Sequence, residues 1–284
     1  MTGAARAARG ALALAALVAI ASLAAACRRA EPPVAATVPV ADAPADVDPS
    51  ACLEDDGKCS EVERLRPECE RGSGYACSGL GWSYSSGEGV RAPDPAAAVQ
   101  AWEAACRFGE PYACANLAII FSRGDGVPKN PARAFTLAVR ACDGGAGHGC
   151  SVAGFLLFKG EGVEVDLARG VKLLERGCAK DDVTACCNFA DALARGLGTP
   201  VDRPRAMRLA AALCEKSAEG CDTLYDVSTT SGASIEEFGE AAKLLRAACE
   251  RGDEKACSRA EELERIVRKH AKKHGGRGPR DTSR

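Results

Sequence analysis

The sequence has few of the residues on which metal and redox sites usually depend. Only three histidines occur in 284 residues, and no two cysteines form a C-x-x-C pair. Zinc fingers, zinc ribbons and thioredoxin-like proteins therefore lose their usual support, and we expect no metal site and no cofactor. Aromatic residues make up 5% of the chain and the formal net charge is −2, so the composition does not indicate a nucleic-acid-binding protein.

Cysteine itself is abundant, with 16 residues in the chain. So many thiols without metal or redox motifs disfavour a reducing cytosol. Hydrophobic residues make up 46% of the sequence, which is too apolar for wholesale disorder. The composition therefore predicts a folded protein that is exported to an oxidising compartment.

The first residues carry the features of an export signal. Arg6 and Arg9 precede an apolar stretch over residues 11–26, which is too short and too rich in alanine for a membrane span. Small residues then come directly before Cys27, which resembles a bacterial lipobox with a lipidated cysteine. The alternative is an ordinary signal peptide cleaved at an A-x-A site. We expect a lipoprotein signal peptide over residues 1–27 and a location in the bacterial cell envelope, periplasm-facing or in the outer membrane.

A tether and a short cap follow the signal. Residues 28–50 are rich in proline and alanine and lack periodic apolar spacing, which is typical of an extended spacer. Only ten residues separate Cys59 from Cys69, too few for a full two-helix unit. Residues 51–68 are therefore interpreted as a truncated N-terminal cap.

The remaining cysteines define a repeat. Most stand in pairs eight or seven residues apart, and from Cys69 onward the first members recur every 35 to 37 residues. A period in this range indicates a solenoid. After each second cysteine, apolar residues recur at positions three, four and seven, as in Leu117, Ala118 and Phe121 after Cys114, which is one face of a helix.

Turn signals separate the predicted helices. A glycine-rich turn such as that over residues 124–127 ends the first helix of a unit, because glycine adopts positive φ without strain. Asn130-Pro131 and its counterparts then start the second helix. The pattern predicts an all-α solenoid of about five helix-turn-helix units over residues 69–258, then a capping helix and a basic disordered tail over residues 259–284.

The two cysteines of a pair flank a predicted turn between helices, and such a turn can bring their Cα atoms within disulfide range. Each bridge would contribute roughly 2.5 kcal/mol in the loop-entropy description. The alternative, redox catalysis, needs activated thiols, whereas these pairs recur uniformly as structural staples do. The expected disulfides are Cys52–Cys59, Cys69–Cys77, Cys106–Cys114, Cys142–Cys150, Cys178–Cys186, Cys214–Cys221 and Cys249–Cys257.

The combination L-G/A-x-x-Y/F-x-x-G-x-G-V, then D/N-P-x-x-A, then A-x-x-G, resembles the Sel-one-like repeat family, a relative of the tetratricopeptide repeat. The resemblance covers residues 69–257 and implies a right-handed α/α solenoid. The cysteine pairs are similar to those of a cysteine-rich bacterial branch, some of whose members have been named penicillin-binding or β-lactamase-like. The broader family is understood as adaptors that bind proteins or peptides.

A solenoid of this kind offers a concave groove lined mainly by the first helices of its units. Cations nine residues after the second cysteine would hold carboxylates of an extended peptide there. The alternatives are that these cations complement the helix macrodipole and that the aromatic residues belong to the core. The candidate groove residues are Trp82, Asn116, Arg123, Phe155, Lys159, Asn188 and Arg195.

Cys187 is left over by the pairing scheme. Its register position is small and largely polar in the other units, as at Ser78, Ser151 and Asp222, which predicts a partly exposed thiol. The thiol is either an unpaired structural residue or one half of an intermolecular disulfide that joins two chains.

The C-terminal segment is strongly basic. Residues 265–284 carry eight Lys and Arg against one acid. This segment would contact anionic envelope polymers or lipid head groups, or it is simply a solvated helix end. His270 and His274 share a helical face but lack the further ligands of a metal site.

No catalytic motif is found. The S-x-x-K, S-D-N and K-T-G motifs of serine β-lactamases are absent, and His148 is the only histidine within the repeats. We therefore expect no catalytic residues and a non-enzymatic scaffold, anchored in the envelope, that binds a protein or peptide in its groove. The alternative is a β-lactamase-like, penicillin-binding or peptidoglycan-peptide-binding protein.

Overall fold

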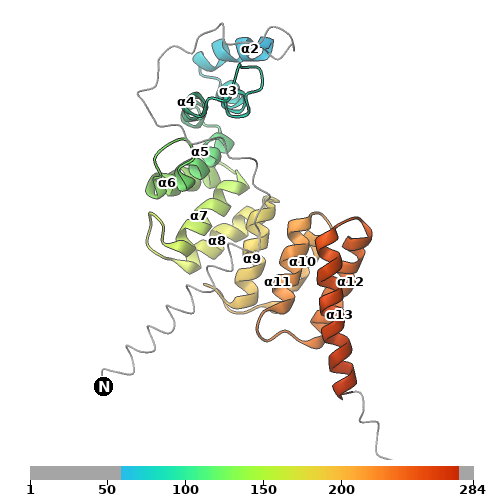
Figure 1. Ribbon diagram of the computed structural model, residues 1–284. Helices are drawn as coiled ribbons and strands as arrows, with labels where there is room; N and C mark the ends of the chain where they lie inside the picture. Colours follow the sequence, from blue (N-terminus) through green and yellow to red (C-terminus); the bar gives the residue numbers. More distant parts are fainter. Residues whose placement is uncertain (1–58, 275–284) are drawn as a thin grey trace, which may run out of the picture. The chain divides into compact units, whose positions relative to one another are not determined.

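The computed structural model describes residues 59–274, which form twelve helices and no strand (Figure 1). The predicted all-α solenoid fold is confirmed, with short turns joining consecutive helices. The helices are α2 (Cys59–Glu70), α3 (Gly74–Ser86), α4 (Pro95–Arg107), α5 (Pro111–Arg123), α6 (Pro131–Asp143), α7 (Gly147–Lys159), α8 (Leu167–Cys178), α9 (Val183–Arg195), α10 (Arg203–Cys214), α11 (Ala218–Thr229), α12 (Ile235–Glu250) and α13 (Glu254–His274).

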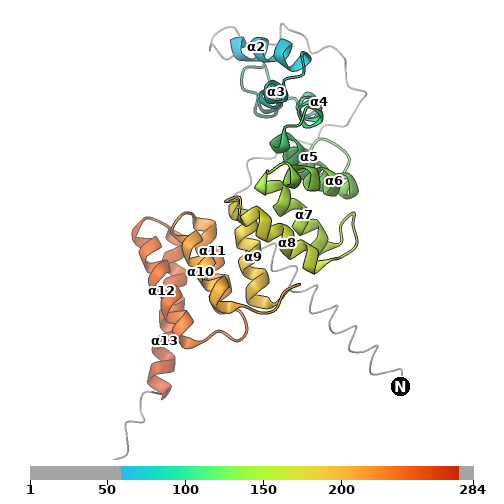
Figure 2. The ribbon, with the colours of Figure 1, turned by 180° about the vertical axis from the view of Figure 1, so that it is seen from behind.

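The described residues divide into two compact units, an N-terminal unit of residues 59–185 and a C-terminal unit of residues 186–274. Odd-numbered helices α3 to α11 are the first helices of the predicted repeats, and even-numbered helices α4 to α12 are the second. Within the N-terminal unit, both views show α5 to α8 as successive hairpins (Figure 2).

The helices begin and end where the turn signals predict. Each of four even-numbered helices starts at an Asp or Asn whose side chain accepts a hydrogen bond from an amide three residues later, which satisfies an otherwise unpaired donor. Helices α3, α5, α7 and α9 end at glycines in the left-handed region, such as Gly87 and Gly124 with φ of 80° and 87°, whereas α11 ends at Thr230. The four capping residues are Asp94, Asn130, Asp166 and Asp202, at 2.9–3.0 Å.

Disulfides join each even-numbered helix to the odd-numbered helix that follows it. The pairs eight residues apart have Cα–Cα distances of 4.5–4.8 Å. Cys178 and Cys186 are also disulfide-bonded. The predicted Cys52–Cys59 pair and Cys27 lie outside the residues whose side chains the structure describes. The pairs seen directly are Cys69–Cys77, Cys106–Cys114, Cys142–Cys150, Cys214–Cys221 and Cys249–Cys257.

Arginines tie neighbouring even-numbered helices together. Arg140 of α6 donates to the carbonyl of Arg107 at the end of α4, at 3.5 Å. Arg176 of α8 donates to the carbonyl of Cys142 in the same way, at 3.3 Å. These guanidinium groups donate to carbonyls at the C-terminal end of the preceding even-numbered helix, and they complement its negative end.

The turns closed by cysteines eight residues apart place one residue in the left-handed region, three residues after the first cysteine. Gly72, Gly109, Gly145 and Gly252 hold this position with φ of 92–101°, but the turn between α8 and α9 has Asp181, with φ of 58°. A side chain is disfavoured there because its Cβ crowds the following carbonyl.

We expect Asp181→Gly to raise the free energy of unfolding by about 0.5–1 kcal/mol, because it removes this crowding. Asp181→Ala should lower it, since alanine keeps the Cβ and loses the polar side chain that tolerates this conformation. Urea unfolding of the oxidised protein measures both changes. If the glycine variant is less stable than the alanine variant, the interpretation that Asp181 strains the backbone is wrong.

Cys187 is fully buried, with 0% of its side chain exposed, and its Sγ lies 3.9 Å from the carbonyl oxygen of Glu219. The prediction of a partly exposed thiol is therefore wrong. The equivalent Ala115 and Ser151 are also buried, so this position is small because the packing is tight rather than because it faces solvent. A buried thiol is not positioned to form a disulfide with a second chain.

Candidate partner-binding face of the N-terminal unit

One side of helix α7 remains open. Nine of its thirteen residues are buried. The four others are His148, Val152, Phe155 and Lys159, spaced four, three and four residues apart. This spacing places all four on one face of the helix.

Helix α5 repeats this arrangement beside α7. Tyr112, Asn116, Ile119 and Arg123 hold the same four register positions, and each is exposed or half-buried. The two helices lie side by side in both ribbon views (Figures 1 and 2). We call these eight residues of α5 and α7 the α5–α7 face.

Trp82 of α3 holds the register position that Ile119 holds in α5 and Phe155 holds in α7. Its ring is 58% exposed and meets the ring of Trp102 edge-on, with centroids 5.9 Å apart. A Cβ on the neighbouring Gly81 would lie 2.3 Å from Nε1 of Trp102, so glycine makes room for that buried ring. The predicted groove residue Trp82 is thus on the surface, while Trp102 belongs to the core.

The α5–α7 face combines positive charge with apolar side chains. Arg123 is exposed and makes no ion pair with any residue between 59 and 274. Lys159 holds its Nζ 5.5 Å from the ring centroid of Phe155, a cation–π contact. Ile119 stands four residues before Arg123, and Phe155 stands four residues before Lys159, so each apolar side chain lies about one helical turn from a cation. The face can therefore bind a carboxylate next to an apolar side chain.

The two predicted groove residues in the C-terminal unit behave differently. Asn188 is only 5% exposed, so the expectation that it lines an open surface is wrong. Arg195 is half-buried, and its Nε donates to Oδ1 of Asp191 at 2.5 Å. The row of three cations expected from the sequence is therefore reduced to Arg123 and Lys159.

The repeat family can now be identified. The family model for the Sel1 repeat matches residues 74–107, 111–145, 149–182, 183–219 and 235–253, which together are more than half of the sequence. The chain belongs to the Sel1 repeat family. No curated protein matches the chain.

Two solved structures share the Sel1 repeat fold. One is c5321, a protective antigen of uropathogenic Escherichia coli strains displaying an SLR fold, with 24% identity and a TM-score of 0.60. The match covers 69% of this Sel1 repeat protein and 42% of c5321. The other is a Sel1 repeat protein from Oxalobacter formigenes, with 21% identity, a TM-score of 0.52 and coverage of 77% and 81% of the two chains. At these identities the likeness shows the fold alone.

A buried and a half-buried carboxyl group lie close together in the later Sel1 repeats. Asp191 of α9 is 0% exposed, and its Oδ2 has no hydrogen-bond partner within the described residues. Burial raises the pKa of Asp191, and the hydrogen bond from Arg195 opposes that shift. Burial and the nearby Asp191 raise the pKa of Asp226 on α11 to about 6. The Arg195 guanidinium thus opposes the pKa rise of both carboxyl groups. The sequence pattern did not predict this arrangement.

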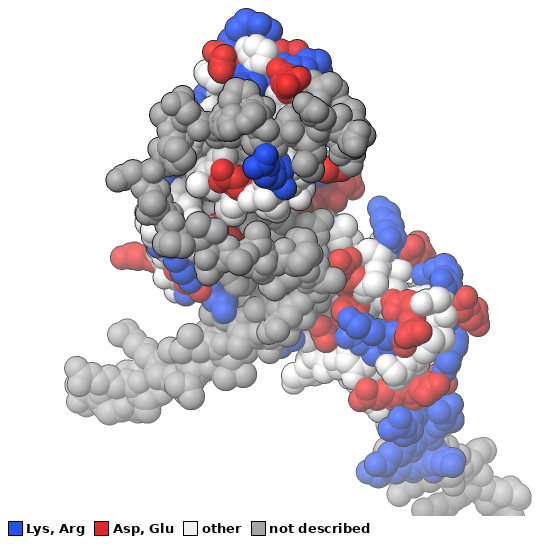
Figure 3. All heavy atoms as spheres, turned by 45° about the horizontal axis from the view of Figure 1, so that its top comes forward, with Lys and Arg blue, Asp and Glu red and all other residues white. Residues whose placement is uncertain are grey.

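The last helix of this Sel1 repeat protein ends in a basic surface. Helix α13 begins at Glu254, before the predicted Arg259, and runs to His274. Its last turns carry an exposed group of Lys and Arg (Figure 3). Over residues 59–274, no helix combines the length and the hydropathy that crossing a membrane requires. The exposed cations are Arg265, Arg268, Lys269, Lys272 and Lys273.

Proposed function

We propose that this Sel1 repeat protein is an envelope-anchored scaffold that binds an acidic peptide or protein segment on the α5–α7 face. The observation that carries the proposal is the pair of accessible cations, Arg123 and Lys159, beside Ile119 and Phe155. One disulfide at the start of α5 and another at the start of α7 hold these helices on a rigid frame. A preorganised surface binds with a smaller loss of conformational entropy.

The anchoring part of the proposal rests on sequence and redox chemistry. Disulfides persist in oxidising compartments outside the cytosol. Cys27, the expected lipidation site, lies outside the described residues, and the tether of residues 28–50 would separate the lipid from the repeats. A lipid chain would hold the protein at a membrane without a spanning helix.

A charge-reversal experiment tests the binding face. A photo-crosslinking amino acid at Phe155 captures the partner in cells, and mass spectrometry identifies it. Titration calorimetry with the purified partner then compares the wild type with the Arg123→Glu/Lys159→Glu variant. We expect the double variant to bind at least about tenfold more weakly, because each cation then repels the acidic partner.

Lys172→Glu is the matched control, since it reverses an exposed cation on α8 outside the α5–α7 face. Its affinity for the captured partner should equal that of the wild type. An equal loss in the control variant and the double variant would mean that net charge, and not the α5–α7 face, governs binding.

The same chemistry supports a second candidate function. β-Lactams and peptidoglycan stem peptides also carry carboxylates, which Arg123 and Lys159 would attract. Hydrolysis of nitrocefin by the purified protein, lost in the Arg123→Glu/Lys159→Glu variant, would replace the scaffold proposal with a β-lactamase-like activity.

A further inference from the structure

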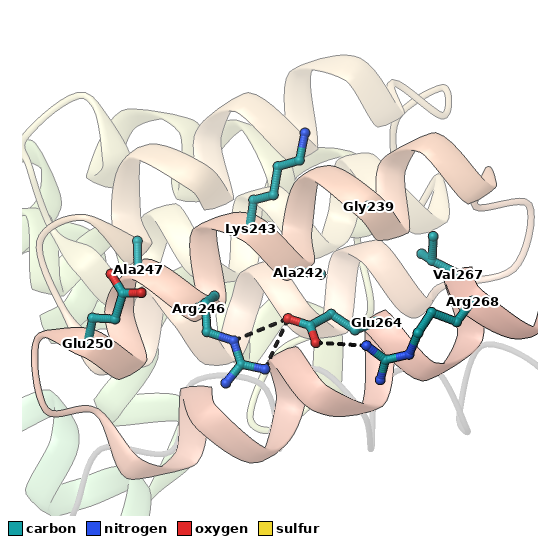
Figure 4. Close-up of a pocket in the computed structure, with 9 residues that line it drawn as sticks. All are labelled: Gly239, Ala242, Lys243, Arg246, Ala247, Glu250, Glu264, Val267 and Arg268. Atoms are coloured by element: carbon teal, nitrogen blue, oxygen red, sulfur yellow. Dashed lines mark hydrogen bonds and ion pairs between the residues drawn. The ribbon is translucent and has the colours of Figure 1, made fainter.

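A hollow lies along the last two helices of the C-terminal unit (Figure 4). It has a volume of about 420 Å³, and Gly239, Ala242 and Val267 form its apolar part. A neighbouring hollow of about 510 Å³ continues it between Ile235 of α12 and Ala271 of α13. Together they form an open groove, which we call the α12–α13 seat.

Earlier in the chain, the surface of α6 that corresponds to this part of α12 packs against the next even-numbered helix, α8. Arg169 of α8 lies over the ring of Phe135 of α6, 5.4 Å from its centroid. Arg176 of α8 pairs with Asp143 of α6 at 3.0 Å. Phe135 and Asp143 stand seven residues before and one residue after the first cysteine of their hairpin.

Ala242 and Glu250 hold these two positions in α12, counted from Cys249. Both line the hollow, and no helix within residues 59–274 follows α13 to cover them. The α12–α13 seat is therefore built like the surface on which α6 holds α8. A helix is the occupant that its shape favours.

The charges of the seat differ from those of its counterparts. Between α4 and α6, Glu103 accepts a hydrogen bond from Arg133 at 2.7 Å, and the guanidinium of Arg133 lies 4.2 Å from the ring centroid of Phe121. By register, Arg246 replaces Glu103 and Glu264 replaces Phe121. At α12 an arginine therefore replaces the acid that pairs with the incoming Arg133, and an acid of α13 replaces the neutral ring beneath that arginine.

Arg246 and Arg268 both pair with Glu264, at 3.0 Å and 3.3 Å, and reach it from opposite sides (Figure 4). These two guanidiniums keep the pKa of Glu264 below its usual value. Lys243 adds a third cation, which pairs with no acid in the described chain. In the middle of the seat these three cations surround one carboxylate, whereas Glu250, Glu240 and Glu236 line the parts of the seat toward the two ends of α12.

We propose that the α12–α13 seat binds an amphipathic helix of a partner protein that carries an Asp or Glu where α6 carries Arg133. The acid would meet Lys243, Arg246 and Arg268, and the apolar side of the helix would pack on Ala242 and Val267. A Cβ built on Gly239 meets nothing within 4 Å, so the backbone there is open to close approach. This surface lies in the C-terminal unit and is distinct from the α5–α7 face.

Peptides that copy part of helix α6 test this proposal. Two fluorescein-labelled, N-acetylated peptides copy residues 130–145 with Cys142→Ser, and one of them also carries Arg133→Glu. Fluorescence anisotropy measures their binding to the full oxidised chain. The Arg133→Glu peptide should bind about tenfold more tightly than its parent, and Lys243→Glu in the protein should remove that preference. Lys216→Glu, an exposed cation at the end of α10, is the control and should preserve it.

Equal affinity of the two peptides, or binding of neither at about 1 mM, overturns the proposal. A concentration-dependent dimer in sedimentation, abolished by Lys243→Glu, would assign the seat to a second copy instead. The Arg123→Glu/Lys159→Glu variant should bind the acidic peptide as the wild type does. Loss of function at the α5–α7 face is therefore distinguishable from loss at the α12–α13 seat.

Discussion

Replacing Gly220 by alanine is expected to lower the free energy of unfolding by about 3 kcal/mol, because the chain has no room for one methyl group there. A Cβ at Gly220 would lie 2.1 Å from the carbonyl carbon of Leu213 and 2.5 Å from the amide nitrogen of Cys214. Both are backbone atoms, so no side-chain rotation relieves the contact. The Cys214–Cys221 disulfide closes this turn with a Cα–Cα distance of 4.0 Å.

Gly239→Ala is the matched control in the same unit. A Cβ there meets nothing within 4 Å, and the residue lies in the middle of α12. Alanine should stabilise this helix by about 0.5–1 kcal/mol relative to glycine. Urea unfolding followed by circular dichroism, with the disulfides intact, measures both variants. A Gly220→Ala protein as stable as the wild type would refute the close packing of this turn.

Asp226→Asn is expected to stabilise the protein at neutral pH and not at acidic pH. Burial and Asp191 raise the pKa of Asp226 from 3.8 to about 6, so the folded state binds this proton more tightly than the unfolded chain. Its stabilising contribution is complete below pH 3.8 and is lost as the pH rises through about 6. Asparagine is neutral throughout and avoids that loss.

The expected gain at pH 7.5 is about 1–2 kcal/mol, because solvent around the partly exposed carboxyl screens part of the full effect. Near pH 3.5 the variant and the wild type should be equally stable. Guanidinium unfolding at the two pH values provides the comparison, and Glu240→Gln controls for the loss of one negative charge. A gain of equal size at both pH values would show that the carboxyl pair does not titrate with folding.

Much of the fold could be predicted because its signals are local. Asp94 and Asn130 cap helices through their own side chains, and Gly124 ends a helix through its own backbone. A cysteine pair eight residues apart spans a single turn, so its disulfide needs no knowledge of the rest of the chain. Each of these features depends on residues within one or two helical turns.

The errors concern packing between helices that are distant in sequence. Helix α9 is buried continuously from Ala185 to Ala194, so Asn188 and Asp191 lie inside although their register positions are partly exposed in α5 and α7. Residue spacing says which side chains share a face, but it does not say whether another helix covers that face. Asp191 also shows that a polar residue can occupy such a covered position when an arginine four residues later reaches it.

Part of the candidate site was accessible to the same reasoning but was missed. Tyr112 stands seven residues before Ile119, two helical turns away, and so shares its face. His148 has the same relation to Phe155, and both lie at the start of their helices, where the prediction did not extend. The replacement of Glu103 by Arg246, and of Phe121 by Glu264, can be interpreted only once α12 and α13 are seen to pack together.

The placement of the disulfides has a consequence for how the chain responds to proteases. Each bridge spans the turn from an even-numbered helix to the next odd-numbered one, such as residues 106–114, whereas glycine-rich turns such as residues 87–90 are unbridged. A cut inside a bridged turn leaves both fragments covalently attached until a reductant is added. A cut inside an unbridged turn interrupts the covalent chain, so only noncovalent packing then retains the severed part. Complete digestion at the unbridged turns should therefore give fragments about 35 to 37 residues long, the period of the repeat.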